Sequence, residues 1–154
     1  MGKEIERKFL VKDQSFKSMA SSVDRIEQGY VSLRPGGTVR VRIKNDRAFI
    51  TVKGLNTGAV RDEWEYEIPL NDAREMIDRV TEGTVIKKCR YNVDYEGRKW
   101  EVDVFEGAHQ GLVLAEIELE SADAQIELPP FIGEEVTGNP QYYNSVLSGI
   151  SKFN

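Results

Sequence analysis

Glutamate, glutamate and lysine occupy every second position near the start of the chain, in the run Glu4-Ile5-Glu6-Arg7-Lys8. Successive side chains of a β-strand point to opposite faces, so this spacing predicts that Glu4, Glu6 and Lys8 share one face. Six further stretches repeat the spacing. Three are basic or polar at alternate positions: Arg40, Arg42 and Lys44; Thr51 and Lys53; and Lys88 and Arg90. Three are acidic: Glu63, Glu65 and Glu67; Glu101 and Asp103; and Glu116, Glu118 and Glu120.

This sorting of charge by strand indicates a binding site. Sheet faces that only meet water usually mix both signs, because like charges at neighbouring positions repel. Carboxylate oxygens are the ligands that hard divalent cations prefer, and arginine and lysine bind phosphate groups. The stripes together predict a metal-assisted site for a strongly anionic ligand such as a polyphosphate. The alternative is that the stripes are solvated faces, which is the commoner reading of any single stripe.

The elements that must position these stripes are mainly β-strands. Alternation and turn signals predict eight of them, near 3–11, 29–34, 38–44, 47–53, 60–69, 85–95, 98–106 and 112–121. Short turns such as Pro35-Gly36-Gly37 and Glu96-Gly97 separate consecutive strands at hairpin distances. The strands therefore form an antiparallel meander.

Three helices are predicted beside the strands. One covers 71–82, with an apolar face and a capping box between Asp72 and Glu75. A second covers 14–22. A third follows Pro140, with an apolar side made of Tyr143, Val146, Leu147 and Ile150.

Each strand has one charged and one apolar face, and two architectures satisfy that pattern. In a sandwich the apolar faces form the core and the charges face water. In a closed barrel the charges line the bore and the apolar faces lie outside, under helices. Sorted charge on so many strands favours closure. We predict one α+β, mostly β domain over residues 1–154, an eight-stranded antiparallel closed barrel with a charged interior and a few outer helices.

The composition of the chain argues against several kinds of partner and site. The net charge of −5 argues against a partner that is duplex nucleic acid, because such binding needs a basic surface. No apolar run is long enough for a membrane helix and the first residues are too charged for a secretory signal, so we expect a cytoplasmic protein with no membrane partner. The single cysteine, Cys89, excludes an internal disulfide and a thiolate metal site. The single histidine, His109, is expected to be a polar turn residue.

The N-terminal run, followed by Phe9-Leu10, resembles the Glu-x-Glu-x-Lys signature of the CYTH superfamily, the triphosphate tunnel metalloenzymes. The later charged pairs follow in the family's order, and the resemblance is strongest to small bacterial tripolyphosphatases. It extends to the segment 133–137 and to Tyr142-x-Asn144. It implies an eight-stranded antiparallel tunnel with an internal substrate site.

The resemblance also implies the roles of the charged residues. Triphosphate oxygens would be bound by Lys8, Arg40, Arg42, Lys53, Lys88 and Arg90. The cofactor, Mg²⁺ or Mn²⁺, would be held by Glu4, Glu6, Glu63, Glu65, Asp103, Glu116 and Glu118. The residues expected to act most directly in catalysis are Glu4, Glu6, Lys8 and Lys88. Glu101 is expected near the edge of the site, and the strand-end charges are expected to be solvated: Lys44, Glu67 and Glu120.

The implied activity is metal-dependent hydrolysis of a phosphoanhydride, with inorganic tripolyphosphate as the preferred substrate and pyrophosphate and phosphate as products. Three alternatives stay open: a class IV adenylyl cyclase, a thiamine or nucleoside triphosphatase, and a non-catalytic polyphosphate-binding module. A cyclase needs a nucleoside pocket, but Trp64, Tyr66 and Trp100 alternate with the charges and are expected outside the bore. A thiamine triphosphatase needs an aromatic residue at the mouth of the tunnel, where Tyr142 or Tyr143 could serve. The sequence leaves the oligomeric state open, a homodimer included.

Overall fold

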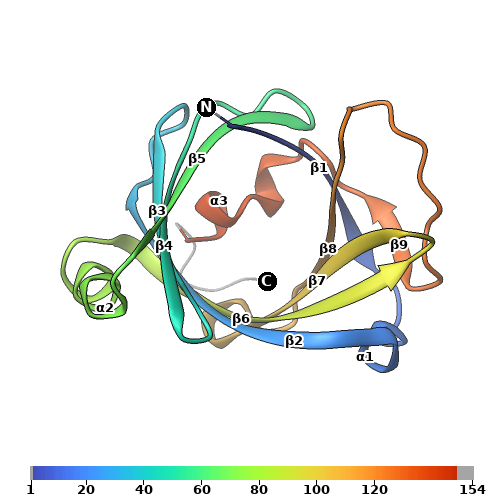
Figure 1. Ribbon diagram of the computed structural model, residues 1–154, viewed down its shortest axis with the longest axis horizontal. Coiled ribbons are helices and arrows are strands. Elements are labelled where there is room, and N and C mark those ends of the chain that lie inside the picture. Colours follow the sequence, from blue (N-terminus) through green and yellow to red (C-terminus); the bar gives the residue numbers. More distant parts are fainter. Residues whose placement is uncertain (1, 149–154) are drawn as a thin grey trace.

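The computed structural model describes residues 2–148. Their strands form one antiparallel sheet that closes into an eight-stranded barrel with one added strand, β9 (Figure 1). The strands are β1 (Gly2–Val11), β2 (Ala20–Ser32), β3 (Thr38–Lys44), β4 (Arg47–Lys53), β5 (Val60–Ile68), β6 (Glu82–Tyr95), β7 (Arg98–Glu106), β8 (Val113–Glu118) and β9 (Ile132–Glu135). The helices are α1 (Phe16–Met19), α2 (Leu70–Arg79) and α3 (Asn144–Ser148), with 3-10 helices η1 (Gly107–His109) and η2 (Pro140–Tyr142).

Strand β1 closes the barrel because it has partners on both sides. Its first half pairs with β5, with Gly2 opposite Glu63, and its second half pairs with β8, with Glu6 opposite Glu118. Strand β9 adds to β1 beyond this point, opposite Phe9. The remaining strands follow in the order β5-β4-β3-β2-β6-β7-β8. The predicted closed barrel is therefore confirmed.

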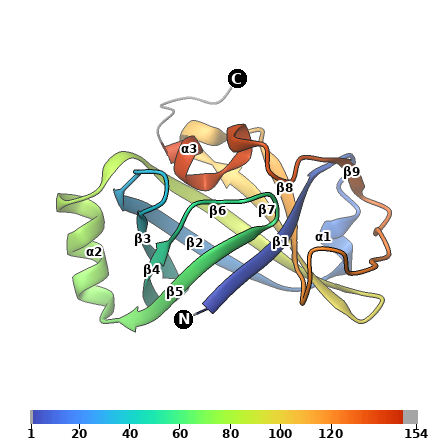
Figure 2. The same ribbon diagram turned by 90° about the horizontal axis from the view of Figure 1, so that it is seen from above.

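Two apolar cores lie on the outer faces of the strands, as the barrel prediction requires. One is built around Trp100, Phe16 and Phe131, where α1 and the segment before β9 pack against the sheet. The other lies under α2, where Ala73 and Ile77 meet apolar residues of β3 and β4 (Figure 2). No helix among residues 2–148 is long and apolar enough to cross a membrane.

A third apolar cluster, which the sequence did not predict, fills one end of the barrel's interior. Phe105 of β7 and Leu114 of β8 lie on the strand faces that also carry the charged residues of the bore. They pack with Tyr30, Ile86 and Leu147 of α3. Figure 2 shows α3 lying over this end. The interior is therefore charged along part of its length and apolar beneath α3.

The predicted helix over 14–22 is wrong beyond a single turn. Helix α1 ends at Met19, and β2 begins at Ala20, where the chain pairs with Val93 of β6. The spacing of Phe16 and Met19 is helical, but the residues after them take partners in the sheet. Strand β2 is therefore much longer than the predicted strand over 29–34.

Two smaller predictions also need correction, and a third falls on a residue that the structure does not describe. Helix α2 starts after Pro69 with no side-chain cap, so the capping box of Asp72 is absent. The helix after Pro140 is split into η2 and α3, because Tyr143 between them is extended. Ile150, predicted on its apolar side, lies outside the described residues.

Candidate active site

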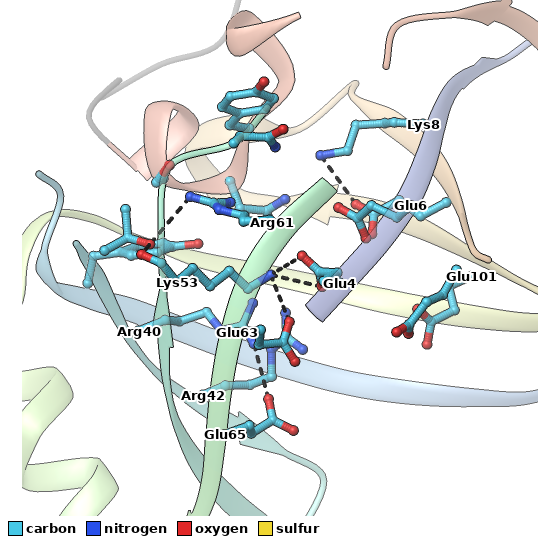
Figure 3. Close-up of a pocket in the computed structure, with 18 of the residues that line it drawn as sticks. Glu4, Glu6, Lys8, Arg40, Arg42, Lys53, Arg61, Glu63, Glu65 and Glu101 are labelled. Carbon is cyan, nitrogen blue, oxygen red and sulfur yellow. Dashed lines mark hydrogen bonds and ion pairs between the residues drawn. The ribbon is translucent and has the colours of Figure 1, made fainter. Parts of the chain in front are cut away.

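The barrel encloses a charged cavity of about 230 Å³ (Figure 3). Every residue predicted for the site lines it except Asp103: Glu4, Glu6, Lys8, Arg40, Arg42, Lys53, Glu63, Glu65, Lys88, Arg90, Glu116 and Glu118. Lys44 and Glu101 line it as well. Lys44 was expected at a solvated strand end, so that expectation is wrong. Glu67 and Glu120 are exposed and pair with surface arginines, as expected.

The register of the sheet brings these side chains to one face. Arg40 lies opposite Thr51 of β4, and Thr51 lies opposite Glu65 of β5. The three side chains are joined, because Arg40 donates to Thr51 Oγ1 at 3.1 Å and Thr51 donates to Glu65 at 2.8 Å. Arg40 Nε is buried and has no hydrogen-bond partner among the described residues. A free buried donor of this kind fits an oxygen of a bound anion.

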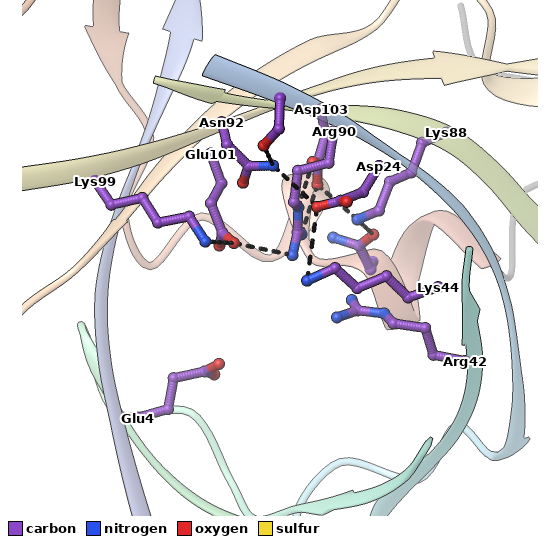
Figure 4. A network of polar contacts seen from close by, with 12 residues as sticks. Glu4, Asp24, Arg42, Lys44, Lys88, Arg90, Asn92, Lys99, Glu101 and Asp103 are labelled. Atoms are coloured by element: carbon purple, nitrogen blue, oxygen red, sulfur yellow. Dashed lines mark hydrogen bonds and ion pairs between the residues drawn. The ribbon is translucent and has the colours of Figure 1, made fainter. Parts of the chain in front are cut away.

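The basic side of the cavity is organised around one buried carboxylate, Asp103 (Figure 4). Arg90 donates to both of its oxygens, at 2.8 and 3.0 Å, and Lys88 Nζ lies 2.6 Å from Oδ2. Burial opposes the charged form of Asp103, but these two cations outweigh it and hold its pKa well below the usual range. Asp103 therefore fixes two cations that face the cavity. Its predicted role as a metal ligand stays a prediction, and both oxygens are engaged with Lys88 and Arg90.

In Lys88 and Arg42 the surroundings disfavour the charged form. Burial, aided by Arg90 and Arg42, lowers the pKa of Lys88 to about 7 in spite of Asp103. Burial and the neighbouring cations Arg40 and Arg90 lower the pKa of Arg42 to about 9. A group of crowded cations in a low-dielectric cavity is stabilised by an anionic ligand.

Opposite these cations lies an acidic wall, which consists of glutamates from three strands: Glu4 and Glu6 of β1, Glu63 and Glu65 of β5, and Glu116 and Glu118 of β8. Burial, followed by the charges of Glu116 and Glu4, raises the pKa of Glu6 well above its usual range. Burial and the hydrogen bond with Glu4 raise the pKa of Glu63 to about 7. Burial also raises the pKa of Glu118. These carboxylates are crowded enough to disfavour their own ionisation.

Lysines neutralise part of the acidic wall. Lys53 Nζ contacts Glu4 at 2.8 Å and Glu63 at 3.5 Å, and Lys8 Nζ lies 3.4 Å from Glu116. Burial disfavours the charge of Glu116, but Lys8 above all lowers its pKa to about 2. Glu6 has no ion pair within the described chain. The wall thus carries more acid than its lysines compensate.

The donor set fits a hard divalent cation in its chemistry. It offers carboxylate oxygens and little else, which suits Mg²⁺ or Mn²⁺. Within residues 2–148, however, no three acidic, histidine or cysteine side chains already converge as a formed metal site. Mg²⁺ is commonly bound by only one or two carboxylates together with water and substrate phosphates, so such a cluster is not required for these glutamates to hold it.

Comparison with known sequences identifies this barrel. A sequence model of the CYTH domain matches residues 2–153. The chain belongs to the CYTH domain family. An inorganic triphosphatase of Acetivibrio thermocellus is 49% identical over 147 residues, covering 96% of this chain and 94% of that protein. An inorganic triphosphatase of Nitrosomonas europaea is 35% identical over 150 residues, covering 94% of this chain and 96% of that protein.

A solved structure agrees in fold. The crystal structure of an inorganic triphosphatase aligns with a TM-score of 0.67 and 32% identity, covering 97% of this chain and 96% of that chain. The predicted resemblance to the CYTH superfamily is therefore confirmed.

The aromatic residues and the histidine of this CYTH domain lie mostly outside the cavity. Trp100 is fully buried in an outer core, and Tyr66 is exposed, so both are outside the bore as predicted. Tyr143 does line the cavity, and Lys8 Nζ lies 5.8 Å from its ring centre. His109 is buried in η1 and its Nε2 lies 2.7 Å from the carbonyl oxygen of Leu147. His109 thus lies in a turn, as expected, but it is buried and contacts α3 instead of water.

The sequence analysis assigned no role to Arg61 and Asn144, which line the cavity, or to Gln28, which lies behind it. Arg61 lies two residues before Glu63 on the same face of β5, so the alternation rule could have found it. Asn144 lines the cavity from α3, and Gln28 is buried behind Arg42. These two are neutral amides, which carry no charge signal in a sequence.

Proposed function

We propose that this CYTH domain hydrolyses inorganic tripolyphosphate to pyrophosphate and phosphate. One observation supports this proposal most: a set of basic side chains and a set of glutamates face each other across one cavity. Basic residues of β3, β4 and β6 face glutamates of β1, β5 and β8. The names of two relatives that align over nearly the whole chain support the same activity.

In this proposal the basic residues bind and orient the phosphates. Arginine offers a planar fork for phosphate oxygens and lysine a point charge, so the mixture grips several phosphoryl groups. Arg40 has a free buried donor, and Arg42 has no carboxylate within ion-pairing distance among residues 2–148. Phosphoanhydride hydrolysis needs mainly positioning and charge neutralisation, which an enclosed cationic cavity supplies more strongly than a surface.

The acidic wall would hold the metal ion. We assign Mg²⁺ or Mn²⁺ to Glu4, Glu6, Glu63, Glu65, Glu116 and Glu118, with Asp103 retained as a predicted contributor. A bound cation neutralises phosphate charge and makes a water molecule more acidic. The glutamates of the wall would orient the attacking water, and their negative charge would repel the phosphate chain from this side of the cavity.

An assay with a panel of substrates tests the proposal. The purified protein is incubated with tripolyphosphate, ATP, thiamine triphosphate and pyrophosphate, with Mg²⁺, Mn²⁺ or a chelator, and phosphate, pyrophosphate and cyclic AMP are quantified. We expect fast release from tripolyphosphate, none in the chelator, and inhibition by excess Ca²⁺, whose looser coordination misplaces groups set for octahedral Mg²⁺. Cyclic AMP as the main product would replace the proposal by a cyclase. Binding without any release would make the protein a polyphosphate-binding module.

One observation favours an organic triphosphate as a second candidate substrate. An apolar chamber of about 560 Å³ adjoins the charged cavity, and Leu33, Leu55 and Val146 line it. The two cavities share Thr38, Arg61 and Tyr143, so an organic group attached to a triphosphate could lie in this chamber. Turnover of thiamine triphosphate or ATP faster than tripolyphosphate would make this candidate the substrate.

A further inference from the structure

Two neutral amides connect two cations that face the cavity from different strands, the partly buried Arg42 and the fully buried Lys88. Gln28 of β2 accepts a hydrogen bond from Arg42 Nε at 2.7 Å through Oε1. Its Nε2 donates to Asn144 Oδ1 at 3.2 Å. The same oxygen of Asn144 accepts from Lys88 Nζ at 2.9 Å. A continuous chain of hydrogen bonds therefore runs from Arg42 through Gln28 and Asn144 to Lys88.

The burial of Gln28 makes this chain unusual. Its side chain is fully buried, yet it does not line the cavity. Burying an amide is costly unless its polar atoms are paired, and here the oxygen and the nitrogen both have partners. The sheet register places Gln28 directly opposite Arg42, so the contact is built into the strand pairing.

The neutrality of the acceptor matters for Arg42. Lys88 and Arg90 are held by the carboxylate Asp103, but Arg42 has no acidic partner within 4.0 Å among residues 2–148. A carboxylate in place of Gln28 would fix the guanidinium and also neutralise it. An amide oxygen fixes the orientation of Nε and leaves the positive charge for a ligand. Figure 4 shows Arg42 and Lys88 on the same side of the bore.

Asn144 extends this control to α3. The segment that carries it is anchored from several sides, since Ser148 donates to the carbonyl oxygen of Thr84 and Tyr142 accepts from Lys8 Nζ through its carbonyl. Asn144 is thereby held at a fixed point above the cavity. Its one oxygen sets the positions of Lys88 and Gln28 together.

We infer that Gln28 and Asn144 are positioning residues that act as one unit and hold Arg42 and Lys88 in the orientation that binds the phosphate chain. The inference rests on the proposed function for its substrate, inorganic tripolyphosphate. Neither amide supplies charge to the substrate. They act by removing the freedom of the two cations before the substrate arrives.

A double-mutant cycle tests the inference. The affinity for tripolyphosphate is measured by calorimetry in a chelator, so that no hydrolysis is needed, for Gln28→Met, Asn144→Leu and the double variant. We expect each single change to weaken binding about 10-fold, and the double variant to be weakened little more than the worse single one, because residues that act as a unit are not additive. In hydrolysis, Gln28→Met is expected to raise KM more than it lowers kcat. Gln141→Met, an exposed amide three residues before Asn144, is the matched control and should leave both readouts unchanged.

A second variant covers the case in which Gln28→Met does not fold. Gln28→Glu keeps the shape and places a carboxylate against Arg42, so it should fold with an unreduced melting temperature and still bind tripolyphosphate at least about 10-fold more weakly. Unchanged affinity in Gln28→Glu, or a double variant weakened about 100-fold, would overturn the inference. If the natural protein binds tripolyphosphate but does not hydrolyse it, the proposed function fails and the cycle still decides the inference. If it does not bind tripolyphosphate, both fail.

Discussion

The folded protein disfavours the charged form of Glu6. Burial and two neighbouring glutamates raise its pKa, and no lysine forms an ion pair with it within the described chain. We expect Glu6→Gln to lower turnover of tripolyphosphate by on the order of 10²-fold or more, because it removes a charge aimed at the reacting centre. The melting temperature should not fall, since the neutral amide removes the repulsion.

Phosphate release as a function of Mn²⁺ concentration, together with thermal melting in a chelator, checks this prediction. Glu67→Gln is the control, because Glu67 lies on β5 but is exposed and paired with Arg47. Identical metal curves for Glu6→Gln and the control would contradict a role for Glu6 in the site.

Arg42 is expected to matter for binding and little for folding. Arg42→Met removes the guanidinium and keeps most of the apolar stem, so kcat/KM for tripolyphosphate should fall by about 10²-fold. The free energy of unfolding should change little, because relief of the repulsion with Arg40 and Arg90 offsets the lost hydrogen bond to Gln28. Steady-state kinetics and urea unfolding measure the two effects. Arg47→Met, at an exposed arginine, should preserve kcat/KM; equal losses in both variants would remove Arg42 from the site.

The sequence located the charged residues of the cavity well because alternation decides which face of a strand a side chain takes. Arg40 and Arg42 had to share a face once their strand was assigned. Gln28 and Asn144 could not be found in this way. Their importance comes from which neighbours their amides reach, and that depends on pairing between β2 and β3 and on the placement of α3.

At the scale of the elements, α3 is held to the barrel by its apolar side. Leu147 is fully buried in the cluster that fills one end of the interior, and the adjacent Val146 is partly exposed. Leu147→Ala should cost about 2 to 5 kcal/mol of unfolding free energy. It should also raise KM for tripolyphosphate, because the segment that holds Lys8 and Lys88 loosens.

Urea unfolding and steady-state kinetics of Leu147→Ala and Val146→Ala compare the two positions. The Val146 change should cost much less, since its side chain is 40% exposed. A Leu147→Ala variant that loses stability but keeps its KM would show that α3 packs on the barrel without positioning the lysines.

Strands with regular alternation were the predictable elements. The predicted bounds of 38–44, 47–53 and 98–106 agree with β3, β4 and β7. The start of β2 was not predictable, because residues 21–25 contain one apolar side chain, Val23, and so show no alternation. Phe16 and Met19 before them have helical spacing. Strand β9 is only four residues long and follows two prolines, so its sequence carries too few positions to show a period.

At the scale of the whole molecule, the pKa values of Glu63 and Glu116 are shifted in opposite directions, and these shifts predict how the free energy of unfolding depends on pH. The pKa of Glu63 is raised to about 7, so between its ordinary value of 4.5 and pH 7 the folded protein binds more protons than the unfolded chain. Stability from this group therefore falls as the pH rises through that window. The pKa of Glu116 is lowered to about 2, so its stabilisation is present above pH 4.5 and is lost as the pH falls toward 2.

The metal-free protein should consequently be most stable near pH 5. Urea unfolding in a chelator at pH values from 3 to 7 measures the curve. Glu63→Gln should become more stable relative to the natural protein as the pH rises from 4.5 to 7, because the glutamine has no proton to lose. A constant difference between the two proteins across this window would contradict the shift of Glu63.

The partners of β1 have a consequence for how the protein is made. This strand is synthesised before all the others, yet it pairs with β5, β8 and β9, and β8 and β9 come last along the chain. A ribosome-bound chain therefore has no complete cavity until β8 has emerged, and β1 must wait with free edges, where its charged residues discourage pairing with other chains. We therefore expect the charges with which β1 lines the cavity, Glu4, Glu6 and Lys8, also to protect this strand against aggregation during translation.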